Sequence, residues 1–128
     1  MAKSKRIPRP TDAELAILRV LWRRGPSTVR QVHDVLRAEK PTGYTTVLKF
    51  MQIMTEKGLL LRDESSRSHV YRPQRPAEKT QQQLVGDLLD RAFEGSAQRL
   101  VMQALNAKKV TPEELAEIRA LLDEIERR

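Results

Sequence analysis

Cysteine is absent from the sequence, which excludes disulfide bonds, a thiol nucleophile and thiolate metal sites. Aromatic residues are few, with one Trp, two Tyr and two Phe in 128 residues, so any hydrophobic core must be small and mostly aliphatic. No apolar run approaches the roughly 18 residues of a membrane-spanning helix, and the basic start of the chain, MAKSKRIPRP, lacks the apolar stretch of a signal peptide. We therefore expect a soluble cytoplasmic protein.

Motifs that carry catalysis are also missing. The sequence has no His-Glu-x-x-His pair, no Gly-x-Ser-x-Gly turn and no glycine-rich phosphate loop. Its two histidines make no metal site, because zinc needs at least a third protein ligand and none is identifiable. We interpret His33 as a polar-face or hydrogen-bonded helix residue, whereas phosphate contact and plain exposure suit His69 equally well. The sequence thus predicts a protein that is not an enzyme and holds no cofactor or metal.

Charge is plentiful but unevenly distributed. Charged residues make up 32% of the chain, and the formal net charge is +7. Residues 1–75 hold 16 Lys and Arg against 7 Asp and Glu, a net charge of +9, whereas residues 76–128 have a net charge of −2. Pro73 and Pro76 lie between the two parts and rule out a continuous helix there. We therefore predict two domains, 1–75 and 76–128, of which the first would attract a polyanion.

Local signals in the first domain predict three helices followed by a hairpin. Capping boxes at Thr11–Glu14 and Thr28–Gln31 start the first two helices, and glycine-proline and lysine-proline pairs end them. The third helix begins after a threonine-glycine pair and ends at Gly58, a residue type that favours helix C-termini. Two short runs, residues 59–63 and 68–72, flank a polar turn and read as two antiparallel strands.

The second domain is predicted to be all-helical. Apolar residues at helical spacing mark helices over about residues 78–93 and 97–105 and a third that starts at Thr111. Three short amphipathic helices bury too little surface to be stable alone, so we expect a second copy of the chain to cover them. Packing on the chain's own first domain is the alternative. The expected dimerisation residues are Leu84, Leu88, Phe93, Leu100, Val101, Leu115, Ile118, Leu122 and Ile125.

The third helix, which begins YTTVLKFMQIMTEKG, has two unlike faces. A helical wheel gathers apolar residues on one side, where they would dock on the first two helices: Tyr44, Val47, Leu48, Met51 and Met54. The other side starts with Thr45 and Lys49, with Thr46 beside them. Short hydroxyl side chains and a cation near a helix N-terminus suit entry into the major groove of double-stranded DNA. Arg67, at the expected tip of the hairpin, is placed to reach an adjacent groove or the backbone.

Longer stretches resemble one known family. PTDAELAILRVLWRRGPSTVRQVHDVL, YTTVLKFMQIMTEKGLL with the following RDESSRSHVYRP, and FEGSAQRLV and TPEELAEIRALL are similar to the penicillinase repressor family of the BlaI/MecI type. The resemblance implies a mostly α fold, with a winged helix-turn-helix domain of three helices and a two-stranded wing before a small all-α dimerisation domain. It also implies a homodimer that represses transcription at a short palindromic operator. Tyr44, Thr45, Thr46 and Lys49 would then contact DNA from the third helix, and Arg67 from the wing.

Two departures from the family bear on regulation. Copper-responsive relatives carry a cysteine-rich motif, which this chain lacks, so a copper sensor of that kind is excluded. The β-lactamase repressors of the family are inactivated when a membrane metalloprotease sensor triggers cleavage at an Asn-Phe bond, and the corresponding bond here is Gln103-Ala104. Regulation by such a sensor therefore stays open, as do the target gene and the inducing signal.

A function of another class is a winged-helix adaptor that recruits a protein partner through its helical tail. The net charge of +9 on residues 1–75 disfavours this alternative, because an adaptor does not need it.

Overall fold

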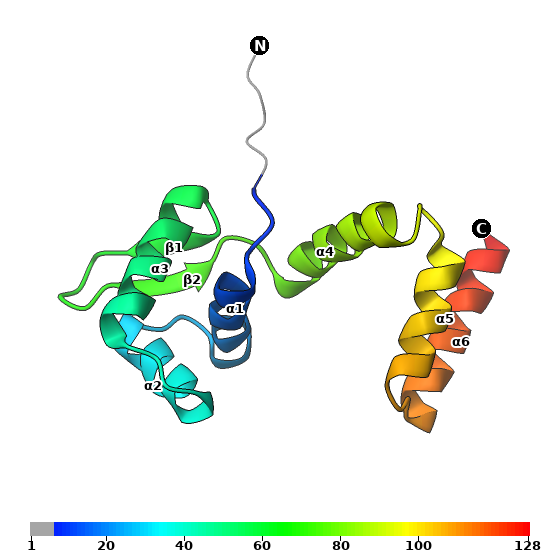
Figure 1. Ribbon diagram of the computed structural model, residues 1–128, viewed down its shortest axis with the longest axis horizontal. Helices are drawn as coiled ribbons and strands as arrows, with labels where there is room; N and C mark the ends of the chain where they lie inside the picture. Colours follow the sequence, from blue (N-terminus) through cyan, green and yellow to red (C-terminus); the bar gives the residue numbers. More distant parts are fainter. Residues whose placement is uncertain (1–6) are drawn as a thin grey trace, which may run out of the picture. The chain divides into compact units, whose positions relative to one another are not determined.

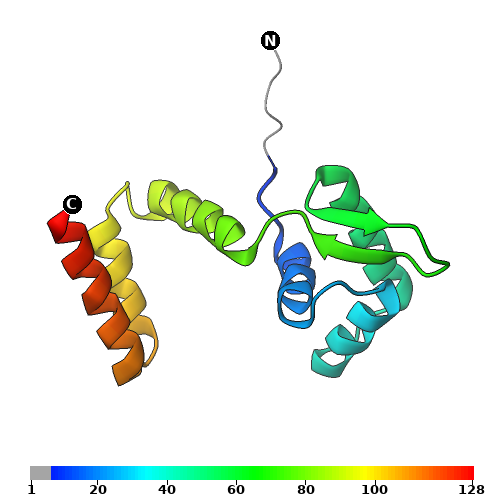
Figure 2. The same cartoon turned by 180° about the vertical axis from the view of Figure 1, so that it is seen from behind.

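The computed structural model describes residues 7–128, and the basic segment 1–6 of the N-terminal stretch lies outside the described residues. Helices dominate this part of the chain, with one two-stranded sheet (Figures 1 and 2). The elements are α1 (Asp12–Arg24), α2 (Val29–Glu39), α3 (Tyr44–Lys57), β1 (Leu60–Asp63), β2 (Val70–Pro73), α4 (Ala77–Ala92), α5 (Ala97–Ala107) and α6 (Pro112–Arg127). The predicted order of three helices, a hairpin and further helices is confirmed.

Side-chain caps fix where several helices begin. The Thr11 hydroxyl accepts a hydrogen bond from the Glu14 amide at 3.2 Å, and the Glu14 carboxylate accepts one from the Thr11 amide at 3.0 Å. Thr28 and Gln31 form the same reciprocal pair at the start of α2. Gly58 ends α3 in the left-handed region, with a φ of 86°, where a residue without a Cβ is favoured. These sequence-local signals account for the observed boundaries.

The core of the first unit lies between the three helices and the hairpin. Its buried side chains are aliphatic or sulfur-containing except for one tyrosine, as the low aromatic content requires: Ile17, Leu18, Val20, Leu21, Val29, Val32, Val47, Met51, Met54, Leu59, Leu60 and Tyr71. The apolar face of α3 supplies Val47, Met51 and Met54, so the opposite face of the same helix is left for solvent.

The hairpin pairs β1 with β2 in antiparallel register, from Leu60 opposite Pro73 to Asp63 opposite Val70. Ser27, in the α1–α2 loop, exchanges two backbone hydrogen bonds with Tyr71 at 3.0 and 2.8 Å, which ties β2 to the helices. β1 begins one residue later than predicted. The Leu59 amide bonds to the Met54 carbonyl at 2.9 Å and so belongs to the end of α3.

The chain divides into two compact units, one ending at Leu84 and the other running from Val85 to Arg128, so the division falls inside α4. In the second unit α5 and α6 bury no residue fully. Its large exposed hydrophobic residues are Val85, Leu88, Val101, Met102, Leu121, Leu122 and Ile125. None of the described helices is long and apolar enough to cross a membrane.

Candidate nucleic-acid interface

The start of α3 presents a polar face to solvent. Thr45, Thr46 and Lys49 are all exposed, and the first turn of the helix carries no acidic residue. The N-cap is Gly43, whose lack of a side chain leaves the first amides of α3 without a side-chain cap. A helix start of this kind combines small hydroxyl groups, a cation and unpaired amides, all of which suit phosphate oxygens or base edges.

Tyr44 is only partly covered by its neighbours. The helical wheel places it on the side of α3 that docks on the first two helices, and its exposed fraction is 39%, whereas that of Val47 is 1%. As the first residue of the helix it lies against α2 side chains: its ring centre is 5.8 Å from that of His33, and the Arg30 guanidinium carbon is 5.1 Å from it. The Tyr44 side chain is therefore accessible at the position where the sequence placed a DNA contact.

The loop before α3 is held by a histidine. Nε2 of His33 lies 2.8 Å from the carbonyl oxygen of Thr42, and because a carbonyl can only accept, Nε2 carries the proton. His33 is 9% exposed, which agrees with its interpretation as a hydrogen-bonded helix residue. No group of three or more potential ligands that could hold a metal ion occurs in the described part of the chain.

At the other end of α3 an ion pair to a buried carboxylate joins this helix to α1. Nζ of Lys57 lies 2.8 Å from Glu14 Oε2, and the Glu14 side chain is 2% exposed. Burial opposes ionisation of Glu14, but hydrogen bonds from Lys57 and from the Thr11 amide outweigh it and lower the pKa of the carboxyl below its usual value. The carboxylate is thus charged at neutral pH and fixes the C-terminal end of α3.

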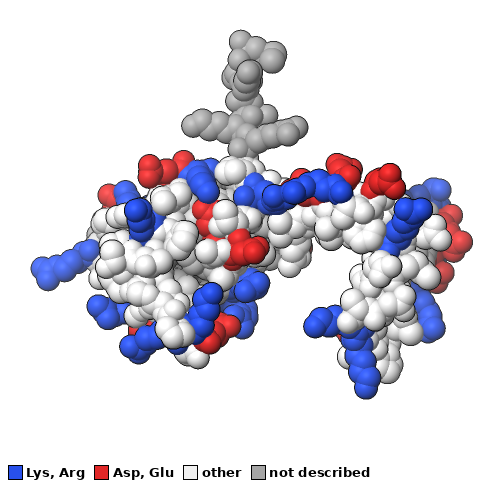
Figure 3. Space-filling view, viewed as in Figure 1, with Lys and Arg blue, Asp and Glu red and all other residues white. Residues whose placement is uncertain are grey.

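The hairpin loop carries one basic side chain without a partner. Nη2 of Arg62 lies 2.6 Å from Oε2 of Glu64 in an ion pair, and hydrogen bonds from Ser65 lower the pKa of Asp63. Arg67 is exposed and makes no ion pair or hydrogen bond within residues 7–128. Figure 3 shows a basic side chain projecting beyond the hairpin loop and others spread around the first unit. Its net positive charge is therefore accessible to a polyanion.

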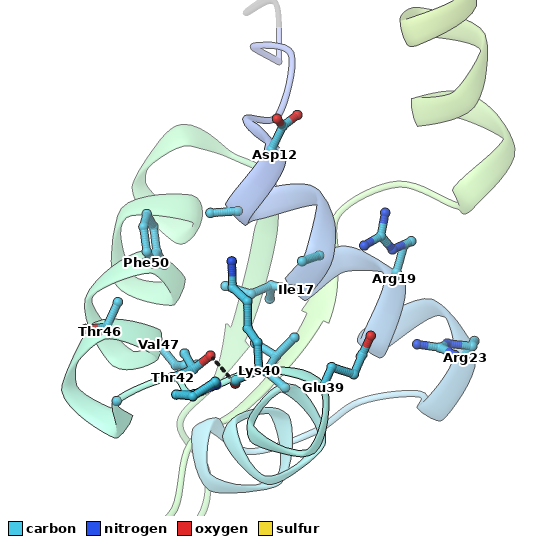
Figure 4. Close-up of a pocket in the computed structure, with 15 residues that line it drawn as sticks. Asp12, Ile17, Arg19, Arg23, Glu39, Lys40, Thr42, Thr46, Val47 and Phe50 are labelled. Atoms are coloured by element: carbon cyan, nitrogen blue, oxygen red, sulfur yellow. Dashed lines mark hydrogen bonds between the residues drawn. The ribbon is translucent and has the colours of Figure 1, made fainter.

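A pocket of about 670 Å³ lies beside α3, between α1 and the α2–α3 loop (Figure 4). Ile17, Val47 and Phe50 contribute apolar surface, and Lys40 extends across the opening towards α1. The Thr42 hydroxyl donates to the Lys40 carbonyl at 3.0 Å, which stabilises the loop. The charged residues around the pocket are of both signs: Asp12, Glu39, Arg19, Arg23 and Lys40. This mixture selects no single class of charged ligand.

The expected dimerisation residues all lie on helices of the C-terminal half or directly after one. Leu88, Val101, Leu122 and Ile125 are 44–54% exposed, and Leu84, Phe93, Leu100, Leu115 and Ile118 are half-buried. Val85, Met102 and Leu121 are exposed as well, although the sequence analysis did not select them. An apolar surface is thus available on these helices within a single chain.

Comparisons with known proteins point to one family. A family profile described as penicillinase repressor matches residues 10–124. The transcriptional regulator BlaI of Mycobacterium tuberculosis is 35% identical over 127 residues, which cover 98% of this chain and 89% of that protein. The penicillinase repressor of Bacillus licheniformis is 24% identical over 120 residues, and 94% of each chain is covered.

Two solved structures share the fold. The solution structure of the DNA-binding domain of the repressor BlaI has a TM-score of 0.51 and 26% identity, and it covers 58% of this chain and 90% of that chain. The monomeric form of Bacillus licheniformis BlaI in complex with the blaP half-operator also has a TM-score of 0.51, with 25% identity, and covers 59% of this chain and 92% of that one. The predicted winged-helix fold class is confirmed.

Proposed function

Because the chain belongs to the penicillinase repressor family, we propose that it is a transcriptional repressor that binds a short palindromic operator as a homodimer and blocks transcription. Its relatives are transcriptional repressors rather than enzymes, in agreement with the sequence. The observation that carries the proposal is the exposed polar start of α3, in the unit where the basic residues concentrate. An operator-binding repressor of this kind works in the bacterial cytoplasm, where the chromosome lies.

In this proposal α3 enters the major groove with its first turns. Tyr44, Thr45, Thr46 and Lys49 contact base edges or flanking phosphates, and Arg67 contacts the backbone or the adjacent groove. The buried residues of α3 support this assignment, because they fix which face of the helix remains for DNA. The complex of the Bacillus licheniformis protein with a half-operator supports one winged-helix unit per half-site.

The homodimer is proposed on the unpartnered apolar side chains of the second unit. Their area is removed from water when a second copy covers them, and apolar burial contributes roughly 25 cal/mol per Å². Two linked DNA-binding units also raise the effective concentration of the second unit once the first has bound. These two effects together favour a dimer on a palindromic site.

A binding titration on DNA from the chain's own promoter tests the function. The full chain is titrated onto this DNA and onto scrambled DNA at several salt concentrations. We expect preferential binding to the promoter DNA and a logarithm of affinity that falls linearly with the logarithm of salt concentration. A salt slope near zero would contradict DNA binding and favour a protein-interaction adaptor.

A further inference from the structure

Three side chains from α2 and α3 contact one another where these helices meet. The Arg30 guanidinium lies over the Tyr44 ring at 5.1 Å, within the ~6 Å range of cation–π attraction. The His33 ring meets Tyr44 edge-on, with an interplanar angle of 77°. The same imidazole donates to the Thr42 carbonyl at 2.8 Å. The side chain of Tyr44 is therefore contacted by an exposed cation and by a buried ring that also holds the loop before α3.

The positive charge of Arg30 does not stabilise α2, so the helix itself gives no reason for a cation at this position. It is the second residue of that helix, where the positive end of the helix dipole disfavours a cation. Neither α2 nor α3 has an acidic residue in its first turn. Asp34 lies one turn further along α2, but in the described structure it approaches Nδ1 of His33 at 3.6 Å and forms no ion pair with Arg30.

We propose that Arg30 binds a backbone phosphate of the operator, that Tyr44 holds its guanidinium in place, and that His33 is a positioning residue for both. The inference rests on the proposed function and adds a residue from α2 to the interface. A guanidinium can cover an aromatic ring and still donate its N–H groups to a phosphate, often in pairs. The helix before the recognition helix characteristically crosses the DNA backbone, where such a contact fixes the register of α3.

Substitutions at Arg30 test the phosphate contact. Arg30→Gln removes the charge and keeps most of the stem, so we expect weaker binding to all operator variants alike and a salt slope smaller by about 1. Arg30→Lys keeps the charge and should retain the slope of the unchanged protein. Arg127→Gln, at the exposed end of α6, is the matched control for net charge and should retain the slope as well. Melting temperatures are measured in parallel to show that each variant is folded.

A second pair of variants tests the roles of the two rings. If Tyr44 acts on the slope only by holding Arg30, then Tyr44→Ala combined with Arg30→Gln should have the slope of Arg30→Gln alone. His33→Gln keeps a donor for the Thr42 carbonyl, whereas His33→Ala removes it. We expect His33→Ala to weaken binding and to lower the salt slope part of the way towards that of Arg30→Gln, because Tyr44 and Arg30 are then less well held. His33→Gln should restore part of both, and a slope that His33→Ala leaves unchanged would contradict the positioning role.

The outcomes separate the inference from the proposed function. If the unchanged protein shows no salt-dependent DNA binding, both fail. If it binds DNA and Arg30→Gln retains the full slope, the inference alone is wrong. An equal loss of slope in Arg127→Gln would also overturn it, because the effect would then be one of net charge.

Discussion

Lys49 on α3 and Arg67 in the hairpin loop are exposed cations in the proposed interface. Replacing either by alanine removes one phosphate neutralisation if both contact DNA, so we expect weaker binding and a salt slope smaller by about 1 for each variant. Circular dichroism should stay unchanged, because neither side chain belongs to the core. Lys108→Ala, in the exposed segment after α5, is the matched control. If Lys49→Ala has the same salt slope as the unchanged protein, Lys49 does not contact a phosphate.

The Glu14–Lys57 pair makes a prediction about stability and pH. Lys57→Met leaves the buried Glu14 carboxylate without its cation, and we expect a loss of about 2 kcal/mol at pH 7. This is less than the roughly 3–5 kcal/mol of a fully buried pair, because the Lys57 side chain is 36% exposed. The free energy of unfolding is obtained from urea denaturation. Lys49→Met is the control on the same helix. Lys49 has no acidic partner among residues 7–128, so its replacement should change the free energy of unfolding little.

The sign of the pH dependence follows from the lowered pKa of Glu14. The folded carboxyl binds a proton less readily than the unfolded one. Its contribution to the free energy of unfolding is therefore complete above the unfolded pKa of 4.5 and is lost as pH falls through the lower folded pKa. The difference in free energy of unfolding between the unchanged protein and Lys57→Met should therefore become smaller in acid. A difference that is constant from pH 7 into this acid range would contradict the assigned role of the pair.

Among the elements, the end of α3 depends on one glycine. Gly58 has a φ of 86°, and a Cβ built there meets no atom within 4 Å, so the left-handed backbone alone opposes a side chain. We expect Gly58→Ala to reduce the free energy of unfolding by about 1 kcal/mol. Gly43→Ala is the comparison at the other end of the helix, where φ is −79° and no left-handed strain opposes a side chain. It should cost less than Gly58→Ala, and only through the poorer N-cap preference of alanine. Equal effects of the two substitutions would show that the left-handed conformation is not the cause.

The sequence predicts an element well where the determining residues are neighbours along the chain. The Thr11 and Thr28 capping boxes and the Gly58 terminus lie within a few residues of the boundaries they set, so all three were recognisable. The stacking of Arg30 on Tyr44 joins residues of different helices, so helical periodicity could not reveal it. Periodicity placed Tyr44 on the side of α3 that docks on α2, as its contacts with Arg30 and His33 confirm, but it could not predict that 39% of the residue stays exposed.

The exposed polar face of α3 could be predicted, because the buried positions of an amphipathic helix determine the opposite ones. The structure confirms that Thr45, Thr46 and Lys49 are exposed, while their contact with DNA stays a prediction. The domain boundary is harder to predict from local patterns. Pro73 and Pro76 flank the predicted boundary at residue 75, but Thr80, one turn into α4, is only 3% exposed. No local pattern predicts which tertiary contacts such a residue makes.

At the scale of the whole chain, truncation tests where the first domain ends. Gln83 accepts a hydrogen bond from Arg75 at 2.8 Å and donates one to the Ile7 carbonyl at 2.9 Å. A fragment ending at Leu84 should therefore have a larger free energy of unfolding, measured by urea denaturation, than one ending at Arg75. We expect a difference of about 1 kcal/mol or more. Both should remain monomeric and bind DNA more weakly than the full chain. Equal stability of the two fragments would favour the predicted boundary at residue 75.

Dimerisation makes a prediction of its own. The full chain should be a dimer by light scattering at micromolar concentration, and Leu122→Asp should make it monomeric by placing a charge among apolar side chains. The matched control is Leu61→Asp, which makes the same substitution at a leucine on β1 that is 37% exposed. This variant should stay dimeric. A monomeric full chain would contradict the proposed homodimer and with it the palindromic operator.

The last prediction concerns how repression ends. We propose that a metalloprotease selective for Asn-Phe does not cut this chain, whose corresponding bond is Gln103-Ala104. Replacing a phenyl group by a methyl removes apolar contact in a protease pocket worth about 2 kcal/mol, or roughly 30-fold in kcat/KM. The bond lies within α5, which must also open locally before any protease can bind it.

Incubation of the purified protein with membranes that carry such a sensor, after exposure to a β-lactam, should leave the chain intact by mass spectrometry. The double variant Gln103→Asn with Ala104→Phe should be cut, since both side chains are exposed on α5 in the single chain and the variant restores the Asn-Phe bond. Each single substitution serves as a control and shows which side chain the protease requires. A fragment of the unchanged chain ending at Gln103 would refute the prediction, because it would show that the sensor accepts a bond without the aromatic group.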